Sequence, residues 1–123
     1  MHALIVDDSR AMRRILRQIV EPLGFQITEA GNGREALQRL DENVDVDLVL
    51  IDWNMPEMNG LDFVKAVRAN PQYEQLRMVM VTTETEPARM ARALMAGVDE
   101  FVMKPFTRKI LLDKLRLIGV SAN

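Results

Sequence analysis

The sequence contains no cysteine, which excludes disulfide bonds, thiolate catalysis and zinc sites built on cysteine. It has no apolar run long enough to span a bilayer, and Asp7 interrupts the N-terminus before a signal-peptide pattern develops. The net charge is only −2, so bulk electrostatics gives no reason to expect a nucleic-acid partner. Together these absences favour a cytoplasmic protein that binds neither membranes nor nucleic acids.

The composition is that of an ordinary globular protein, with 48% hydrophobic and 28% charged residues. A chain of 123 residues is long enough to bury one hydrophobic core. We find no linker, repeat or change of composition along it. We therefore expect a single domain over residues 1–123 without an effector domain.

Four short apolar runs each end at a polar side chain, and they have the unbroken pattern of strands buried on both faces. The runs lie within residues 3–6, 48–51, 76–81 and 100–103. The polar residues at their carboxyl ends are the pair Asp7 and Asp8, then Asp52, Thr82 and Lys104. A fifth run, at residues 25–29, alternates and indicates a strand nearer the edge of a sheet.

Helical spacing follows each strand. Ser9 is expected to cap the first helix, whose buried stripe would be Met12, Ile15, Leu16, Ile19 and Leu23. Further helices are expected at residues 34–40, 61–69, 87–96 and 107–118. Strands and helices thus alternate five times, and crossovers between parallel strands are right-handed. The predicted fold is α/β: a five-stranded parallel sheet in the order 2-1-3-4-5, doubly wound like flavodoxin, with five helices.

This strand order brings Asp7, Asp8 and Asp52 together at the switch point, where open α/β sheets build their sites. Carboxylates so close repel one another, and a divalent cation relieves the repulsion. Oxygen ligands without histidine or thiolate select Mg²⁺, or Mn²⁺ in its place. Lys104 and Thr82, at neighbouring strand ends, suit the binding of phosphate oxygens. The set predicts that Asp52 is a nucleophile that forms an aspartyl phosphate.

The sequence resembles the receiver domains of two-component response regulators from residue 3 to residue 118. The motifs that carry the resemblance are Asp7–Asp8, residues 52–60, residues 81–82 and residues 104–106, all in family order and spacing. Residues 12–15, 52–56 and 104–107 are most similar to the CheY-like single-domain chemotaxis regulators. Phe101 departs from the tyrosine usual in those regulators, so the aromatic ring is kept and the hydroxyl is lost.

The resemblance implies that Asp52 accepts a phosphoryl group from the phosphohistidine of a sensor kinase or histidine phosphotransfer protein. Asp8, Asp52 and the backbone carbonyl of Asn54 would ligate Mg²⁺, with Asp7 acting through water. Thr82 and Lys104 would contact the phosphoryl group. The family also suggests a cis peptide bond before Pro105. Such a protein catalyses only its own phosphorylation and dephosphorylation and is not otherwise an enzyme.

Output is expected through the surface formed by the helix at 87–96, the strand at 100–103 and the final helix. Phosphorylation would move Thr82 and let the side chain at position 101 turn inward. The residues expected on this surface are Phe101, Arg89, Arg92, Ile110, Lys114 and Leu117. A downstream protein would bind there, and the chain would be a monomer, with a dimer through the same surface as the alternative.

Other functions share parts of the pattern. Residues 31–36 match the G-x-G-x-x-A fingerprint of dinucleotide-binding folds, but they follow the second strand, and the chain is too short for two nucleotide-binding halves. Phosphatases of the haloacid dehalogenase type need an acid two residues after the nucleophile, where this chain has Asn54. A binding module with a degenerate site would lack Asp52 or Lys104. A phosphorelay intermediate that passes its phosphate to a histidine phosphotransfer protein is the main alternative.

Two smaller features are interpreted as having no specific function. The arginines Arg10, Arg13, Arg14 and Arg17 line one side of the first helix and are read as a solvated face, with docking of an acidic partner as the alternative. His2, the only histidine, lies near the chain terminus and is expected to have no specific role.

Overall fold

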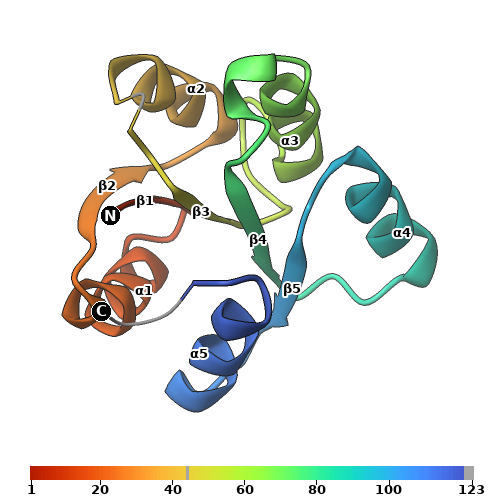
Figure 1. Ribbon diagram of the computed structural model, residues 1–123. Coiled ribbons are helices and arrows are strands. Elements are labelled where there is room, and N and C mark those ends of the chain that lie inside the picture. Colours follow the sequence, from red (N-terminus) through yellow and green to blue (C-terminus); the bar gives the residue numbers. More distant parts are fainter. Residues whose placement is uncertain (44, 121–123) are drawn as a thin grey trace.

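A parallel sheet covered by helices on both faces forms the computed structural model, which describes residues 1–43 and 45–120 (Figure 1). The strands are β1 (His2–Val6), β2 (Gln26–Ala30), β3 (Leu48–Ile51), β4 (Arg77–Thr82) and β5 (Glu100–Met103). The α-helices are α1 (Arg10–Val20), α2 (Gly33–Glu42), α3 (Gly60–Arg68), α4 (Pro87–Ala96) and α5 (Arg108–Leu117). Short 3-10 turns, η1 (Glu21–Leu23) and η2 (Pro71–Tyr73), follow α1 and α3.

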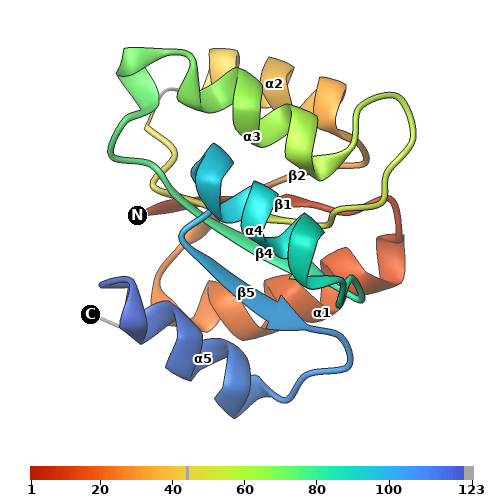
Figure 2. The same ribbon diagram turned by 90° about the vertical axis from the view of Figure 1, so that its right-hand side faces the viewer.

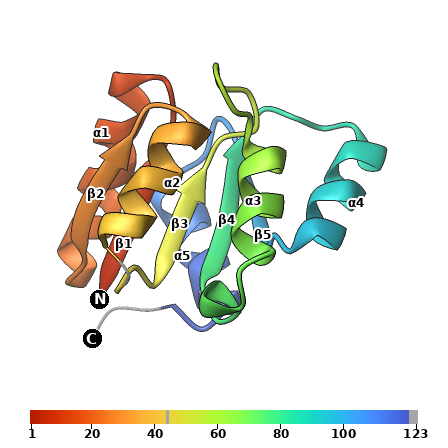
Figure 3. The same cartoon turned by 90° about the horizontal axis from the view of Figure 1, so that it is seen from above.

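The five strands are ordered β2-β1-β3-β4-β5 and all neighbours run parallel, as the sequence predicted (Figure 3). Element boundaries agree with the prediction to within a few residues. The largest difference is at α2, which was predicted at residues 34–40 and continues to Glu42, so that two further acidic residues belong to the helix. Within the described residues, every helix is too short or too polar to cross a membrane.

Two hydrophobic layers flank the sheet, because alternate strand residues point to opposite faces. On one face, Val6 and Ile51 pack with α2, α3 and α4. On the other face, Ile5 and Leu50 pack with α1 and α5. Figure 2 shows α2 and α3 on one side of the sheet and α1 and α5 on the other. Both faces of the central strands are therefore dry, which explains their unbroken apolar runs.

Side-chain caps fix where the helices begin. The side-chain oxygens of Ser9, Asn32, Asn59 and Thr107 each accept a backbone N–H from the first turn of the helix that follows. Pro87 occupies the first turn of α4, where a backbone N–H would have no partner within the helix, so the N–H that proline lacks is not missed. All four capped helices start at the carboxyl end of a strand, or at the loop that follows it, next to the predicted site.

Large apolar side chains are exposed on two helices, and one of them was predicted to be buried. Ile15, expected in the buried stripe of α1, is 44% exposed, because it lies about 100° round the helix from Leu16, which faces the sheet. On α4, Leu94 and Met95 are 51% and 88% exposed. Only Ala93 of that helix is buried, so α4 contacts the core through a narrow stripe.

His2 also contradicts the sequence interpretation. It belongs to β1 and is only 6% exposed. Its Nε2 lies 2.6 Å from Thr28 Oγ1 and its Nδ1 lies 3.3 Å from Asp45 Oδ1, while its backbone N–H donates to Asp47. His2 is ordered because β1 begins at this residue, so the position that was interpreted as a chain terminus without a role belongs to the sheet.

Candidate functional site

Strand register gathers the predicted site residues at one edge of the sheet. Val6 pairs with Ile51, so Asp7 and Asp52 leave neighbouring strands side by side, and the Asp52 N–H donates to the Val6 carbonyl over 3.0 Å. Lys104 follows β5 and donates its backbone N–H to the Thr82 carbonyl over 2.9 Å. The ends of β1, β3, β4 and β5 therefore supply the whole constellation.

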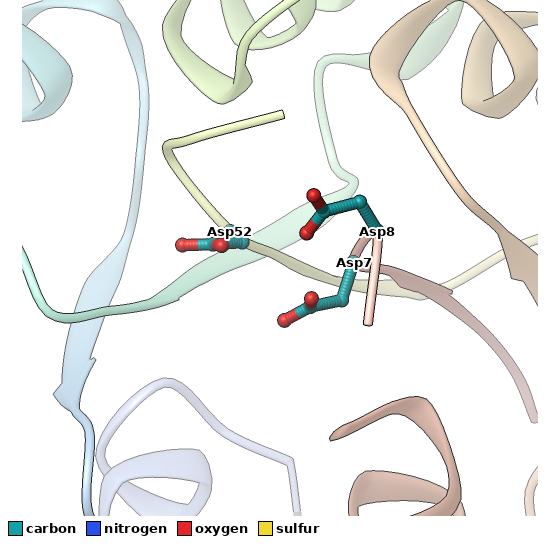
Figure 4. Close-up of side chains that lie close together, drawn as sticks. All are labelled: Asp7, Asp8 and Asp52. Carbon is teal, nitrogen blue, oxygen red and sulfur yellow. The ribbon is translucent and has the colours of Figure 1, made fainter. Parts of the chain in front are cut away.

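The three carboxylates of Asp7, Asp8 and Asp52 form a cluster (Figure 4). Each offers an oxygen, and these oxygens all lie within 4.8 Å of one another. Asp7 and Asp52 are buried, whereas Asp8 is exposed and gives the cluster its access to solvent. Three carboxylate oxygens at this spacing match the ligands that Mg²⁺ and Mn²⁺ prefer, so the residues fit a hard divalent cation.

Lys104 lies against the same cluster. Its Nζ is 2.8 Å from Asp7 Oδ2 and 3.5 Å from Asp52 Oδ2. The other Asp7 oxygen accepts the Ser9 N–H over 2.9 Å, so Asp7 is held from two sides. The peptide bond between Lys104 and Pro105 is cis, as the resemblance suggested. One ammonium faces three carboxylates, which leaves negative charge for a cation to balance.

Burial raises the pKa of the Asp52 carboxyl above its ordinary value. The Lys104 ammonium opposes this effect, the nearby Asp7 carboxylate adds to it, and the hydrogen bond from the Thr82 hydroxyl lowers the pKa. The Trp53 N–H also donates to Asp52 Oδ1 over 2.7 Å. Asp52 is thus a largely buried carboxylate with one oxygen bonded to the backbone and the other turned toward Lys104.

The loop from Trp53 to Gly60 closes over the β3 end of the site. Trp53 is 7% exposed and packs in the core, while Asn54 is exposed. Gly60 returns the loop, donating its N–H to the Trp53 carbonyl over 2.8 Å. A Cβ at Gly60 would lie 2.3 Å from the Asp52 carbonyl oxygen, so only glycine fits this approach. Gly33 similarly abuts the Met58 carbonyl, which explains the glycine-rich turn without a nucleotide.

Arg13 is a site neighbour that the sequence interpretation missed. It was assigned to a solvated face, yet its side chain is 16% exposed. Its Nη1 donates to the Asp7 carbonyl over 2.6 Å and its Nε to Glu29 over 2.9 Å. Arg17 shares the same Glu29 carboxylate. These two arginines tie α1 to β2 and support the backbone at Asp7, whereas Arg10 and Arg14 are exposed as expected.

The predicted output surface is exposed except at its aromatic residue. Ile110 and Leu117 are 46% and 72% exposed, as their helical positions implied. Phe101, in contrast, is 7% exposed and packs in the same core layer as Ala93. A phenylalanine ring has no hydroxyl to keep in contact with water, so it packs inward. Of the basic residues, Lys114 reaches Glu100 over 3.5 Å and Arg89 pairs with Glu84 over 3.1 Å.

The fold and the site define a class of protein. The family model of the response regulator receiver domain matches residues 3–116. The chain therefore belongs to the response regulator receiver family, the family that its motifs resemble. Receiver domains bind Mg²⁺, in keeping with the acidic cluster formed by Asp7, Asp8 and Asp52.

Individual relatives point to one branch of this family. Chemotaxis protein CheY1 of Helicobacter pylori is 45% identical over 119 residues, which cover 96% of each chain. A solved structure of Vibrio cholerae CheY4 matches with a TM-score of 0.88 at 35% identity, covering 95% of this chain and 97% of that one. A chain in the Borrelia burgdorferi complex of CheX, CheY, beryllofluoride and magnesium matches with a TM-score of 0.90 at 27% identity, covering 98% and 90%. The protein is thus homologous to the CheY chemotaxis response regulators.

Proposed function

We propose that the protein is a phosphorylation-switched regulator of a chemotaxis-type two-component pathway, with Asp52 as the phosphoacceptor. The observation that carries this proposal is the position of Asp52, a buried carboxylate that lies close to those of Asp7 and Asp8 and 3.5 Å from the Lys104 ammonium. An oxygen of Asp52 would bond to phosphorus as the phosphorus–nitrogen bond of a donor phosphohistidine breaks. The signal would leave through a partner protein that binds the phosphorylated receiver domain.

The roles of the other residues follow from where they lie. Asp8, Asp52 and the Asn54 carbonyl would hold Mg²⁺, and Asp7 would act through water. The bound cation offsets the negative charge shared by the phosphoryl oxygens and the carboxylates. Lys104 is close enough to both Asp7 and Asp52 to move onto a phosphoryl oxygen with little rearrangement. The Thr82 hydroxyl donates to a second oxygen, and the burial of Asp52 and Thr82 strengthens each contact.

The partners are proposed by chemical class. The donor is a histidine kinase or a histidine phosphotransfer protein, since the family takes phosphate from phosphohistidine. The target binds the surface of α4, β5 and α5, which carries the exposed apolar residues Ile110 and Leu117 and the basic residues Arg89, Arg92 and Lys114. Such a mixed apolar and basic surface suits an acidic amphipathic segment. A CheY chain has been solved with CheX, beryllofluoride and magnesium, which supports partner binding in this branch of the family.

The proposal is tested with beryllofluoride, which mimics a phosphoryl group on a carboxylate. Trp53 follows Asp52 directly and donates its backbone N–H to that carboxylate, so its fluorescence should change when beryllofluoride and Mg²⁺ are added together. Asp52→Asn should give no change, because it removes the acceptor oxygen. Asp62→Asn, at an exposed position of α3, is the control and should respond like the wild type. A wild-type response that Asp52→Asn retains would refute the assignment.

A further inference from the structure

Thr82 is held from one side by the loop that follows it. The residue is fully buried, and its Oγ1 accepts the backbone N–H of Glu84 over 3.2 Å. A threonine hydroxyl has a single hydrogen, and a lone pair is already used by this N–H. The hydrogen is therefore left to donate toward Asp52. Any displacement of Thr82 toward a phosphoryl group changes the distance to the Glu84 N–H.

Both carboxylate oxygens of Glu84 accept hydrogen bonds from residues at the start of α4. Its Oε1 accepts the Glu86 N–H over 3.0 Å, and its Oε2 accepts from Arg89 Nη1 over 3.1 Å. The Glu84 side chain is only 13% exposed although it is charged. The Glu86 N–H, with Arg89, lowers the pKa of the Glu84 carboxyl, so it stays ionised at neutral pH. Arg89 also approaches Glu86 Oε2 at 3.4 Å.

These contacts connect Thr82 to the start of α4. Glu86 is the N-cap residue of α4, yet its own side chain makes no capping bond. Glu84 supplies the acceptor for the Glu86 N–H instead. Ala93 is the only buried residue of α4, so the core holds this helix through few contacts, and the ion pair from Glu84 to Arg89 ties its first turn to the preceding loop.

We propose that the Glu84–Arg89 ion pair is a latch that makes Glu84 a positioning residue for Thr82 and holds the protein in its resting state. The inference rests on the proposed function, in which a phosphoryl group on Asp52 draws the Thr82 hydroxyl inward. The latch resists this movement, because the Glu84 N–H is on a loop tied to α4. It also occupies Arg89, a cation of the proposed partner surface, until the loop moves.

Opening the latch should make the phosphorylated state easier to reach. Glu84→Gln and Arg89→Gln each break the ion pair, and each should tighten beryllofluoride binding about two- to fivefold, as expected for one partly exposed pair. The two variants change the net charge in opposite directions. A purely electrostatic effect on the anionic ligand would therefore strengthen binding in Glu84→Gln and weaken it in Arg89→Gln. Only the latch predicts tighter binding in both.

Affinity is measured by titrating Trp53 fluorescence with beryllofluoride at fixed Mg²⁺. Arg89→Lys keeps the ion pair with Glu84 and should therefore bind beryllofluoride with the affinity of the wild type. Arg34→Gln removes the same charge from an exposed position on α2 and should bind like the wild type. Thermal unfolding of each variant checks that the fold is kept.

Changes of opposite sign in Glu84→Gln and Arg89→Gln, or wild-type affinity in both, would overturn the latch while leaving the phosphoacceptor assignment intact. If the wild type itself gave no response to beryllofluoride with Mg²⁺, the proposed function would fail, and the latch with it. Tighter binding in both variants, with Arg34→Gln unchanged, supports the latch.

Discussion

At the scale of single residues, Asp52 combines burial with charge in a way that costs stability. Burial raises the pKa of its carboxyl, so the folded protein holds this proton to higher pH than the unfolded chain does. The contribution of Asp52 to folding stability is therefore greatest below pH 3.8, the ordinary pKa of the carboxyl. It falls as the pH rises from there through the raised pKa of the folded state. A site kept for chemistry rather than stability has this signature.

Asp52→Asn should accordingly unfold at a higher temperature than the wild type near pH 7, because the amide carries no buried charge. The difference should shrink as pH falls through the raised pKa and should vanish below pH 3.8, where the wild-type carboxyl is protonated in both the folded and the unfolded state. Thermal unfolding followed by circular dichroism at a series of pH values measures this. A variant that is less stable than the wild type at neutral pH would contradict the account.

Asp8 is the exposed member of the carboxylate cluster, so its removal tests the metal site without disturbing the core. Asp8→Ala should weaken Mg²⁺ binding by roughly tenfold or more, since even partners of metal ligands contribute that much. The measurement is a Mg²⁺ titration followed by Trp53 fluorescence. Asp113→Ala removes the same charge from the exposed face of α5 and should bind Mg²⁺ normally. Equal affinities in the two variants would exclude Asp8 as a ligand.

Site residues were predictable to the extent that they follow strands. The apolar runs end at Asp7, Asp8, Asp52, Thr82 and Lys104. Because the strands are parallel, their carboxyl ends meet on the same side of the sheet, which brings these residues together. Contacts between distant segments were not predictable, because helical periodicity says which way a side chain points and not what it meets. Arg13 was therefore read as solvated, although it supports the Asp7 carbonyl. His2 was missed for the same reason.

At the scale of elements, the loop after β3 depends on glycine. Gly60→Ala should cost about 1–3 kcal/mol of unfolding free energy, because the new methyl group would force the loop away from the Asp52 carbonyl. The same shift should impair the Mg²⁺ response of Trp53. Urea unfolding and the fluorescence titration measure the two effects.

Gly31→Ala provides a matched control. A Cβ there would meet its nearest side-chain atoms, from Arg13 and Glu35, at 3.8 Å, which is ordinary contact. It should therefore change neither stability nor Mg²⁺ binding noticeably. If the two alanine variants behaved alike, close approach at Gly60 would not explain the glycine.

Helix α4 occupies the predicted residues 87–96, but it buries little of its surface. Leu94 and Met95 are largely exposed, and Ala93 is the one buried residue of the helix. An edge helix over a short strand covers little of the sheet, and no sequence signal distinguishes that position from a central one. Phe101 fills part of the space beneath the helix instead. This arrangement leaves α4 free to respond to the loop at its start.

At the scale of the whole molecule, the sequence predicted strand order and layering because buried parallel strands and alternating helices permit few topologies. How the layers are tied together could not be predicted. Arg68, at the end of α3, donates to the carbonyls of Gly97 and Tyr73 and to the Asp99 carboxylate. One guanidinium thus joins α3, η2 and the turn before β5.

Arg68→Ala should lower the free energy of unfolding by about 1.5–3 kcal/mol, since it removes charged hydrogen bonds at a side chain that is only 19% exposed. Arg68→Lys should recover part of this loss, because an ammonium cannot reach all the same oxygens. Arg34→Ala, at an exposed position, should stay within about 0.5 kcal/mol of the wild type. A loss of unfolding free energy in Arg68→Ala as small as that in Arg34→Ala would show that the hydrogen bonds of Arg68 are not needed for stability.

The account as a whole stands on phosphorylation of Asp52, and locating the phosphoryl group tests it most directly. The protein is incubated with acetyl phosphate and Mg²⁺, the acyl phosphate is reduced with borohydride, and the modified residue is found by peptide mass spectrometry. The account predicts a single Mg²⁺-dependent modification at residue 52 that Asp52→Asn lacks. A phosphoryl group on any other residue, or equal labelling of Asp52→Asn, would contradict it.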